Sequence, residues 1–187
     1  MQKNVYIAFN KPYGILSQFT SDNPSETLAN FNLPKDIYAV GRLDKDSEGL
    51  LILSNDGAFI DKLLSPQNDK EKTYWVQVEN IPTEASLNIL RNGKIKIQDY
   101  LTKPAKVKIL NPQPEISPRI PPIRERKSIP TCWLEVIISE GKNRQVRKMT
   151  ASINHPTLRL MRVKVGKLML DNLAPGEWKY VEKSDII

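Results

Sequence analysis

Short runs of apolar residues, several alternating with polar ones, recur along the chain. Runs of four to nine such residues that end at Gly, Pro, Asn or Asp are typical of β-strands. We therefore expect strands at residues 5–9, 37–40, 50–53, 72–79, 105–110, 131–139, 158–165 and 177–181. The first of these strands should end in a Lys11-Pro12-Tyr13-Gly14 turn.

Three segments carry a helical pattern instead. A short helix should follow the Asn55-Asp56-Gly57 turn, and another should cover residues 84–91, between an N-cap at Thr83 and a stop at Gly93. A third should run from Asn143 to about Ile153. Strands broken by a few short helices predict an α+β fold with a mostly antiparallel or mixed sheet.

The stretch from residue 111 to residue 130 breaks this pattern. It contains six prolines and no apolar periodicity, so we expect a long surface loop rather than a core element. The chain contains no internal repeat, low-complexity tract or linker. A length of 187 residues, 40% of them hydrophobic, then predicts a single domain that covers residues 1–187.

Charge narrows the possible partners. The net charge of +7 favours a polyanion, which could be nucleic acid or a membrane surface. The sequence has no apolar run near the roughly 20 residues that span a bilayer, and its first residues lack the apolar region of a signal peptide. We therefore expect a cytoplasmic protein with no membrane association.

The residue types that are scarce exclude several chemistries. Cys132 is the single cysteine and fits a buried position, while His155 precedes Pro156 and fits a turn. These counts exclude an intrachain disulfide and argue against zinc chemistry, thiol catalysis and a Ser-His-Asp relay. The glycines form neither a dinucleotide fingerprint nor a P-loop, so no cofactor is expected.

The most informative segment is the charged loop at residues 41–49, which a glycine closes at each end. It holds Arg42, Asp44, Lys45, Asp46 and Glu48 between two apolar strands. One carboxylate there could face a cleft and do chemistry, because such loops often carry function. The alternative is a solvated charged turn.

The third helix has a core face and a basic face. Val146, Met149 and Ile153 have core spacing, whereas Arg144, Arg147 and Lys148 fall on the neighbouring face. Lys142 and the N-terminal N–H groups of the helix add to an environment that suits phosphate or carboxylate. A solvated basic face would show the same pattern.

Tyr74 lies near the start of the strand at residues 72–79, on the same side as Val76 and Val78. An aromatic ring there could stack on a base that has left its helix. Packing of the ring in the core is the alternative.

Three motifs in order give the sequence a family resemblance. Residues 41–51, GRLDKDSEGLL, resemble the signature loop of the pseudouridine synthases that modify ribosomal RNA. Residues 72–74, KTY, and 141–149, GKNRQVRKM, resemble the second and third motifs of that family.

Further segments point to one branch of the family. Residues 10–14, NKPYG, and Leu160-Met161-Arg162 with Gly166 fit the branch whose members are designated A when they modify the small ribosomal subunit, and B, E or F when they modify the large one. Residues 121–131 and 173–178 most resemble the group designated E.

The resemblance implies one catalytic domain with a central cleft, no S4 domain, no metal and no cofactor. It implies that Asp44 acts at the ribose, that Tyr74 stacks on the uracil and that Arg147 pairs with Asp44. The other substrate-binding residues that it implies are Arg42, Lys72, Arg144, Gln145 and Leu160. The implied partner is large-subunit (23S-type) ribosomal RNA, bound by a monomer through Lys11, the basic helix and the proline-rich loop.

Two rival hypotheses stay open at this point. A non-catalytic RNA-binding ribosome-assembly factor would keep the basic surface, although a buried carboxylate facing the phosphates would lower its affinity for RNA. A nucleoside hydrolase would need two carboxylates roughly 5 to 10 Å apart, for which Asp46 or Glu48 could supply the second.

Overall fold

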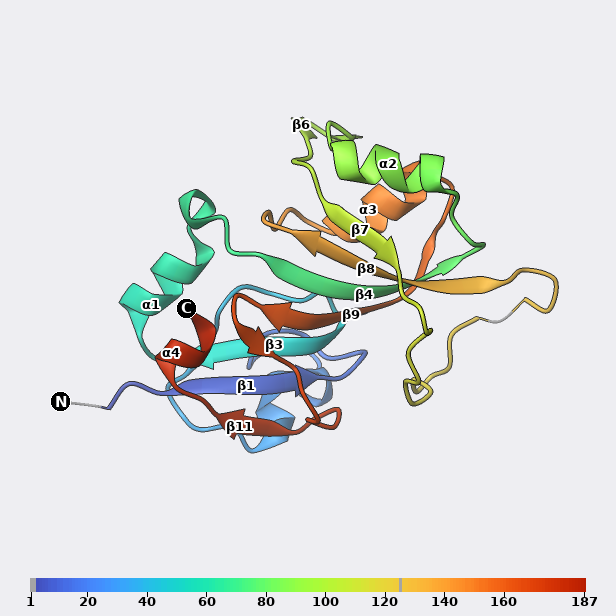
Figure 1. Ribbon diagram of the computed structural model, residues 1–187. Coiled ribbons are helices and arrows are strands. Elements are labelled where there is room, and N and C mark those ends of the chain that lie inside the picture. The colour runs from blue at the N-terminus through green and yellow to red at the C-terminus, as the bar shows by residue number, and fades with distance from the viewer. Residues whose placement is uncertain (1–2, 125) are drawn as a thin grey trace. The chain divides into compact units, whose positions relative to one another are not determined.

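The computed structural model describes residues 3–124 and 126–187. Met1, Gln2 and Glu125, the last of which belongs to the segment 121–131, lie outside the described residues. The chain forms two compact units. The terminal unit comprises Met1–Lys70 and Met161–Ile187, and the middle unit comprises Glu71–Leu160. The α+β class expected from the sequence is confirmed, since strands predominate and the helices are short (Figure 1).

Strand β1 (Tyr6–Lys11) lies at the centre of the terminal unit. It pairs antiparallel with β3 (Glu48–Ser54) and with β11 (Trp178–Tyr180), and Figure 1 shows it between them. Every residue of β1 and β3 is buried, as continuous apolar runs predict for central strands. The remaining strand pairs are β2 (Tyr38–Ala39) with β3, antiparallel; β9 (Thr157–Val165) with β3, parallel at Met161 and Arg162; and β10 (Leu168–Met169) with β9, antiparallel.

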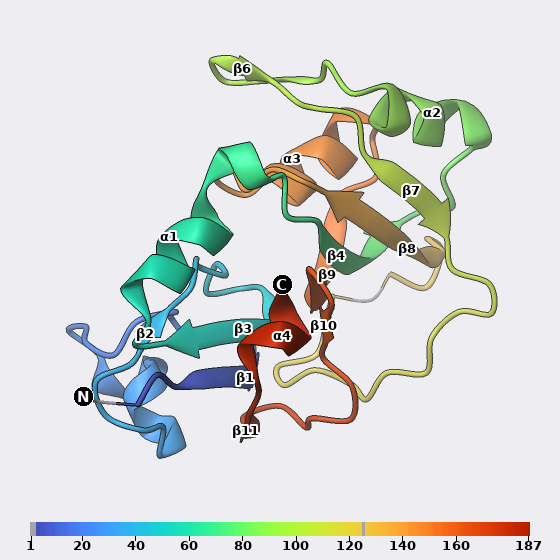
Figure 2. The ribbon, with the colours of Figure 1, turned by 60° about the vertical axis from the view of Figure 1, so that its left-hand side comes forward.

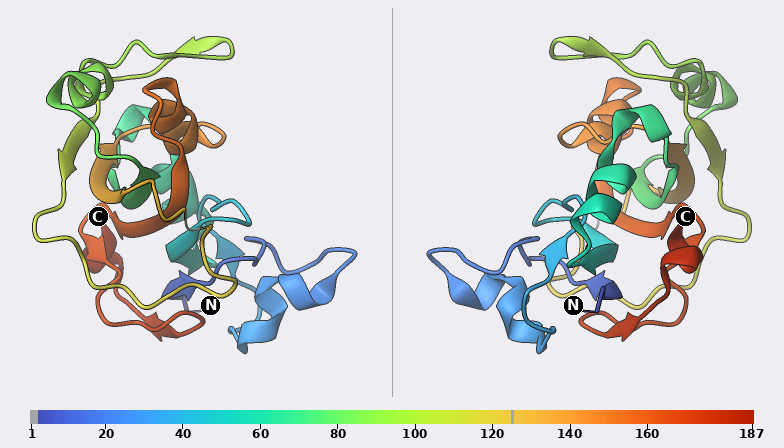
Figure 3. Two further views of the ribbon diagram at one scale, coloured as in Figure 1. Left: turned by 90° about the vertical axis from the view of Figure 1, so that its right-hand side faces the viewer. Right: turned by 90° about the vertical axis from the view of Figure 1, so that its left-hand side faces the viewer.

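Short helices complete the terminal unit. Aromatic pairs join them to β1, because the rings of Phe9 and Phe31 lie 5.0 Å apart and those of Tyr6 and Phe59 lie 5.0 Å apart in a T-shape. The segment between β1 and β2, drawn in blue, projects from the edge of this unit as a long loop with 3₁₀ turns (Figure 3). The helices are α1 (Gly57–Leu64), α4 (Lys183–Ile186) and the 3₁₀ turns η1 (Pro24–Glu26), η2 (Leu28–Phe31) and η3 (Pro66–Asn68).

The middle unit is built on the antiparallel pair β4 (Lys72–Glu79) and β8 (Thr131–Ile138), with β7 (Lys106–Ile109) on the other side of β8. Helix α2 (Glu84–Asn92) packs against β7 (Figure 2). Helix α3 (Gln145–Ser152) packs against β5 (Lys96–Ile97), which forms a small hairpin with β6 (Tyr100–Leu101). Residues 111–130 contain no helix or strand where the structure describes them, which confirms the expected loop.

Several expected boundaries agree closely with the structure. Strand β4 spans the expected residues, and the Thr83 hydroxyl caps α2 by accepting from the Ser86 N–H at 3.2 Å. Gly93, with φ of +68°, ends that helix. Cys132 is buried, and His155 follows α3 with its Nδ1 2.9 Å from the Glu79 carbonyl, as expected for a core thiol and a turn residue.

Other expectations need correction. Helix α3 begins at Gln145 rather than Asn143, because Arg144 adopts a left-handed conformation with φ of +51° and ψ of +32°. Glu48 and Gly49 belong to β3 rather than to the charged loop. Sequence reasoning missed β5, β6, β10, α4 and the 3₁₀ turns, all of which are four residues or shorter.

Asp56 joins three elements of the terminal unit at the end of β3. Its carboxylate accepts hydrogen bonds from the Tyr6 hydroxyl (2.6 Å), the Phe59 N–H (3.0 Å) and the Lys183 ammonium (3.0 Å). Asp56 therefore caps α1 and connects β1 and α4 to that helix. The hydrogen bond from Tyr6, followed by those from Phe59 and Lys183, lowers the pKa of Asp56 to about 2.

Asp56→Asn should lower the melting temperature by several degrees near neutral pH. Because the pKa of Asp56 lies below the usual 3.8, its contribution is present above pH 3.8 and is lost as the pH falls through about 2. The difference in melting temperature between wild type and variant should therefore shrink across that range. Asp171→Asn, which removes an exposed partner of Lys179, is the control and should change little. A pH-independent difference would contradict the role of the carboxylate charge.

Candidate active site

Asp44 lies in the loop between β2 and β3 of the terminal unit, and its side chain is half-buried. Gly41 opens the loop with φ of +75°. The Asp44 carbonyl accepts from the Ser47 N–H at 3.0 Å, which closes a turn just before β3. Arg42 is exposed in the same loop. Asp44 and Asp46 are thus both partly accessible carboxylates of an ordered turn, whereas Glu48 is buried.

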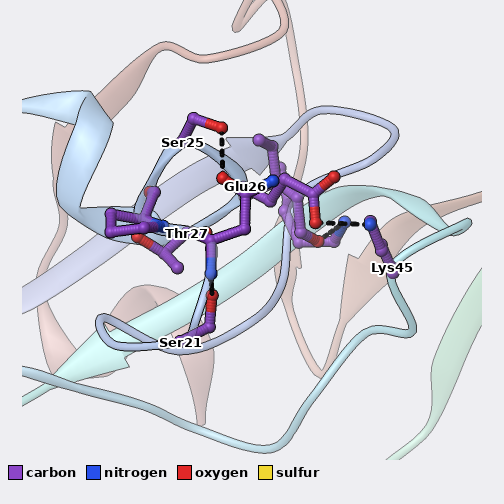
Figure 4. A network of polar contacts seen from close by, with 9 residues as sticks. Ser21, Ser25, Glu26, Thr27 and Lys45 are labelled. Atoms are coloured by element: carbon purple, nitrogen blue, oxygen red, sulfur yellow. Dashed lines mark hydrogen bonds and ion pairs between the residues drawn. The ribbon is translucent and has the colours of Figure 1, made fainter.

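The loop is fastened to the segment between β1 and β2. The Lys45 carbonyl accepts from the Gly14 N–H at 2.8 Å, and the Lys45 ammonium lies 2.5 Å from a carboxylate oxygen of Glu26. Figure 4 shows this ion pair at the end of a network that runs through η1. The residue after Asp44 is therefore held through both its backbone and its side chain.

Three buried charged residues lie at the base of the loop: Lys11, Glu48 and Arg162. The Lys11 ammonium donates to the carbonyls of Pro12 (2.9 Å) and Ile15 (2.7 Å). Burial lowers the pKa of Lys11 to about 7, although the carboxylates of Glu48, Asp46 and Asp44 oppose this shift. Arg162 donates from Nε to the Leu50 carbonyl at 2.8 Å.

Lys11 was expected to contact RNA, and the structure corrects that expectation. Its side chain is fully buried, and its ammonium bonds to carbonyl oxygens of its own turn. The sequence predicted that Lys11 follows the first strand, but not that its side chain is buried there. The buried ammonium of Lys11 is therefore not placed to contact phosphates, and it lies within electrostatic reach of the Glu48, Asp46 and Asp44 carboxylates.

Tyr74 in the middle unit is only 8% exposed, on the face of β4 that also carries Val76 and Val78. The expected arrangement of the strand is confirmed by the burial pattern of β4. Leu160, another expected substrate-binding residue, is also buried. Stacking of Tyr74 on a base stays a prediction.

Gln145 organises the turn that precedes α3. It is 3% exposed, its Oε1 accepts from the Lys142 N–H at 3.1 Å, and its Nε2 donates to the Glu140 carboxylate. The Lys72 ammonium lies 3.5 Å from the Glu140 carbonyl, so Lys72 and Gln145 meet at one residue. Gln145 thus supports the basic turn rather than presenting its amide to solvent.

The cations near α3 differ in accessibility. Lys142 and Arg144 are exposed, whereas Arg147 and Lys148 are half-buried. The Lys142 ammonium lies 5.5 Å from the ring centroid of Tyr100, which links the turn to the β5–β6 hairpin. Val146, Met149 and Ile153 are buried, so the expected division into a core face and a basic face is confirmed.

The predicted site residues fall into two sets. Arg42 and Asp44 belong to the terminal unit, and the other six belong to the middle unit. The pairing of Asp44 with Arg147 and the central cleft both stay predictions. The terminal unit has a pocket of about 490 Å³ lined by residues between Phe19 and Ile37, which include none of the predicted site residues.

Two kinds of feature are absent from the described residues. Within residues 3–124 and 126–187, no group of three or more His, Cys, Asp or Glu side chains is placed to hold a metal ion. No helix in this part of the chain is long and apolar enough to cross a membrane.

Comparison with known proteins assigns the site to a family. The family model for RNA pseudouridylate synthase matches residues 5–152, which include the Asp44 loop, β4 and all of α3. The chain belongs to the RNA pseudouridylate synthase family. Its members are isomerases, so the chain is identified as an RNA-modifying enzyme.

Individual members of the family are similar over most of their length. The chain is 54% identical over 171 residues to ribosomal large subunit pseudouridine synthase E of Xanthomonas axonopodis pv. citri (strain 306), covering 90% of each protein. It is 54% identical over 175 residues to the protein of the same name from Vibrio vulnificus (strain CMCP6), covering 94% of this chain and 74% of that one. A crystal structure of a pseudouridylate synthase, 27% identical, superposes with a TM-score of 0.80 and covers 99% of this chain and 73% of that one.

At Gly49, the start of β3 lies very close to the backbone of β9. Its φ is +100°, and a Cβ there would lie 2.3 Å from the carbonyl oxygen and 2.8 Å from the nitrogen of Arg162. Both are backbone atoms of a paired strand, so neither can move cheaply. Only glycine fits where β3 meets β9.

Gly49→Ala should therefore lower the free energy of unfolding by roughly 3 kcal/mol or more. Gly57→Ala is the matched control, because Gly57 begins α1 and nothing lies within 4 Å of an added Cβ. That change should be neutral or stabilise by about 0.4 to 1 kcal/mol. Urea unfolding followed by circular dichroism measures both, and equal effects of the two variants would contradict the close approach.

Proposed function

We propose that this enzyme isomerises a specific uridine to pseudouridine in large-subunit ribosomal RNA, with Asp44 as its catalytic carboxylate. The observation that carries the proposal is the 54% sequence identity to a relative that is named for this activity, over 90% of that relative's length. The ordered loop that holds Asp44 agrees with it. The two units together would form one catalytic domain that works as a monomer in the cytoplasm.

The reaction conserves the atoms of the substrate. The N1–C1′ bond breaks and a C5–C1′ bond forms, while C5 loses a proton and N1 gains one. Because uridine and pseudouridine are isomers, no co-reactant is consumed. Asp44 would either attack C1′ or remove a proton from C2′, and in both cases it must be ionised and close to the ribose.

The remaining site residues would hold the substrate. The target base must leave its stack to be reached, so Tyr74 would form a platform for the uracil, with Leu160 beside it. Arg147 would pair with Asp44 and keep it ionised away from water. Arg42, Lys72 and Arg144 would contact the RNA backbone, and Gln145 would fix the turn from which Arg144 projects.

The comparisons give no support to the alternative of a non-catalytic assembly factor. The hydrolase alternative predicts free uracil rather than a rejoined base. An assembly factor would have no turnover for an Asp44 substitution to abolish, whereas a hydrolase would differ from a synthase in its product.

Asp44→Asn should lower the single-turnover rate by at least about a hundredfold, because the amide can neither attack the ribose nor take a proton. RNA affinity should stay the same or rise, since one negative charge near phosphates is lost. Release of tritium from C5 of labelled uridine measures turnover, and filter binding measures affinity.

Asp46→Asn removes the same charge from the same loop and serves as the control. It should retain most of the activity. Residual activity of Asp44→Asn above a few per cent, or equal losses in both variants, would contradict the assignment of Asp44. Free uracil in the products would favour the hydrolase.

The proposed substrate generates a separate prediction. The enzyme must reach a base that has left its stack, so local RNA shape and loosened stacking should supply much of the selectivity. Protein-free 23S-type RNA, or an early assembly intermediate, should therefore be modified better than the finished subunit. Chemical mapping of pseudouridine after incubation with purified enzyme tests this, and modification confined to small-subunit or transfer RNA would overturn it.

A further inference from the structure

Ser17 lies in the segment between β1 and β2 and is 8% exposed. Its hydroxyl donates to the Leu43 carbonyl at 2.8 Å and accepts from the Leu43 N–H at 3.0 Å. A single side chain thus satisfies both backbone groups of the residue that precedes Asp44. Both hydrogen bonds are buried, so without the hydroxyl the N–H and the carbonyl of Leu43 would have no water to bond to in its place.

Ser17 is itself held on both sides. The Leu16 N–H donates to the Glu26 carbonyl at 2.7 Å, and the Gln18 carbonyl accepts from the Leu28 N–H at 2.9 Å. The Lys11 ammonium fastens the same turn through the Ile15 carbonyl at 2.7 Å. The hydroxyl therefore meets Leu43 from a backbone that is hydrogen-bonded on both sides of Ser17.

The backbone on the other side of Asp44 is fixed as well. The Asp44 carbonyl accepts from the Ser47 N–H, and the Lys45 carbonyl accepts from the Gly14 N–H. Ser17 supplies the matching restraint at residue 43. The backbone of Asp44 is thus restrained through both of its neighbours.

We propose that Ser17 is a positioning residue for Asp44, acting through the backbone of Leu43. The inference rests on the proposed function, because it holds that Ser17 fixes the position of Asp44, the proposed catalytic carboxylate. A shift of about 1 Å in a reacting group can cost 10²-fold in rate. Ser17 should therefore affect the chemical step more than RNA binding.

The chain offers a matched control in Ser54 at the other end of β3. Its hydroxyl donates to the Val5 carbonyl at 2.7 Å and accepts from the Asp56 N–H at 3.0 Å, and the residue is fully buried. Ser54 thus also satisfies one backbone carbonyl and one backbone N–H in the same unit, although these belong to two residues, and it lies ten residues from Asp44 along the chain. Ser17→Ala and Ser54→Ala should destabilise the protein to a similar extent.

The test compares single-turnover rates at saturating RNA, RNA affinities and melting temperatures. Ser17→Ala should lower the rate by about 10- to 100-fold with unchanged affinity. Ser54→Ala should keep a near-wild-type rate at a temperature where both variants are folded. Ser17→Thr retains the hydroxyl and should recover most of the rate. Ser17→Cys keeps the shape of the side chain with a slightly larger atom, and its thiol forms only weak hydrogen bonds. Its rate should fall as far as that of Ser17→Ala, and it replaces Ser17→Ala if that variant does not fold.

Two results would overturn the inference: a wild-type rate in the folded Ser17→Ala or Ser17→Cys variant, or an equal loss of rate in Ser54→Ala. The Asp44→Asn variant separates this inference from the proposed function. If Asp44→Asn is inactive while Ser17→Ala is fully active, the positioning role alone is wrong. If Asp44→Asn is active, the catalytic assignment is wrong and the positioning role falls with it.

Discussion

Burial of the Lys11 ammonium constrains the whole surroundings of the candidate catalytic loop. An ammonium removed from water is costly unless hydrogen bonds and opposite charges replace its hydration. Two carbonyls of the following turn accept from it, and the carboxylates of Glu48, Asp46 and Asp44 lie within its electrostatic reach. The turn that meets this requirement also carries Ser17. One buried charge thus couples the end of β1, the turn after it and the Asp44 loop.

The two ends of β3 are fixed by different interactions. At its start, Gly49 lets the backbone of Arg162 approach closely, which places β9 beside the base of the loop. At its end, the Asp56 carboxylate bonds to Tyr6 in β1, Phe59 in α1 and Lys183 in α4. Since β3 carries the loop directly on its N-terminal side, a rigid strand gives the loop a fixed base. Precision at Asp44 therefore needs restraints only across the few residues of the loop itself.

The sequence predicted elements that have a periodic pattern or a local capping residue. It missed features that depend on residues far away along the chain. Period-two alternation located β4, and the Thr83 cap and Gly93 located α2. The hairpin of β5 and β6 has strands of two residues, too short to show a period. The start of α3 depends on the left-handed backbone at Arg144. Resemblance drew attention to Asp44, but Ser17 is one hydroxyl whose partner lies 26 positions away, and no local pattern identifies it.

The near-neutral pKa of Lys11 changes how a pH–rate profile of this enzyme should be interpreted. Burial lowers the pKa of Lys11 to about 7, against the opposing carboxylates of Glu48, Asp46 and Asp44, so its charge is sensitive to pH within the range in which such enzymes are assayed. Loss of that charge as the pH rises removes a positive neighbour of Asp44 and weakens the cationic donor to the turn that carries Ser17. A transition near neutral pH therefore needs a comparison with a Lys11 variant before it is assigned to the reacting carboxylate. The group that titrates and the group that reacts need not be the same residue.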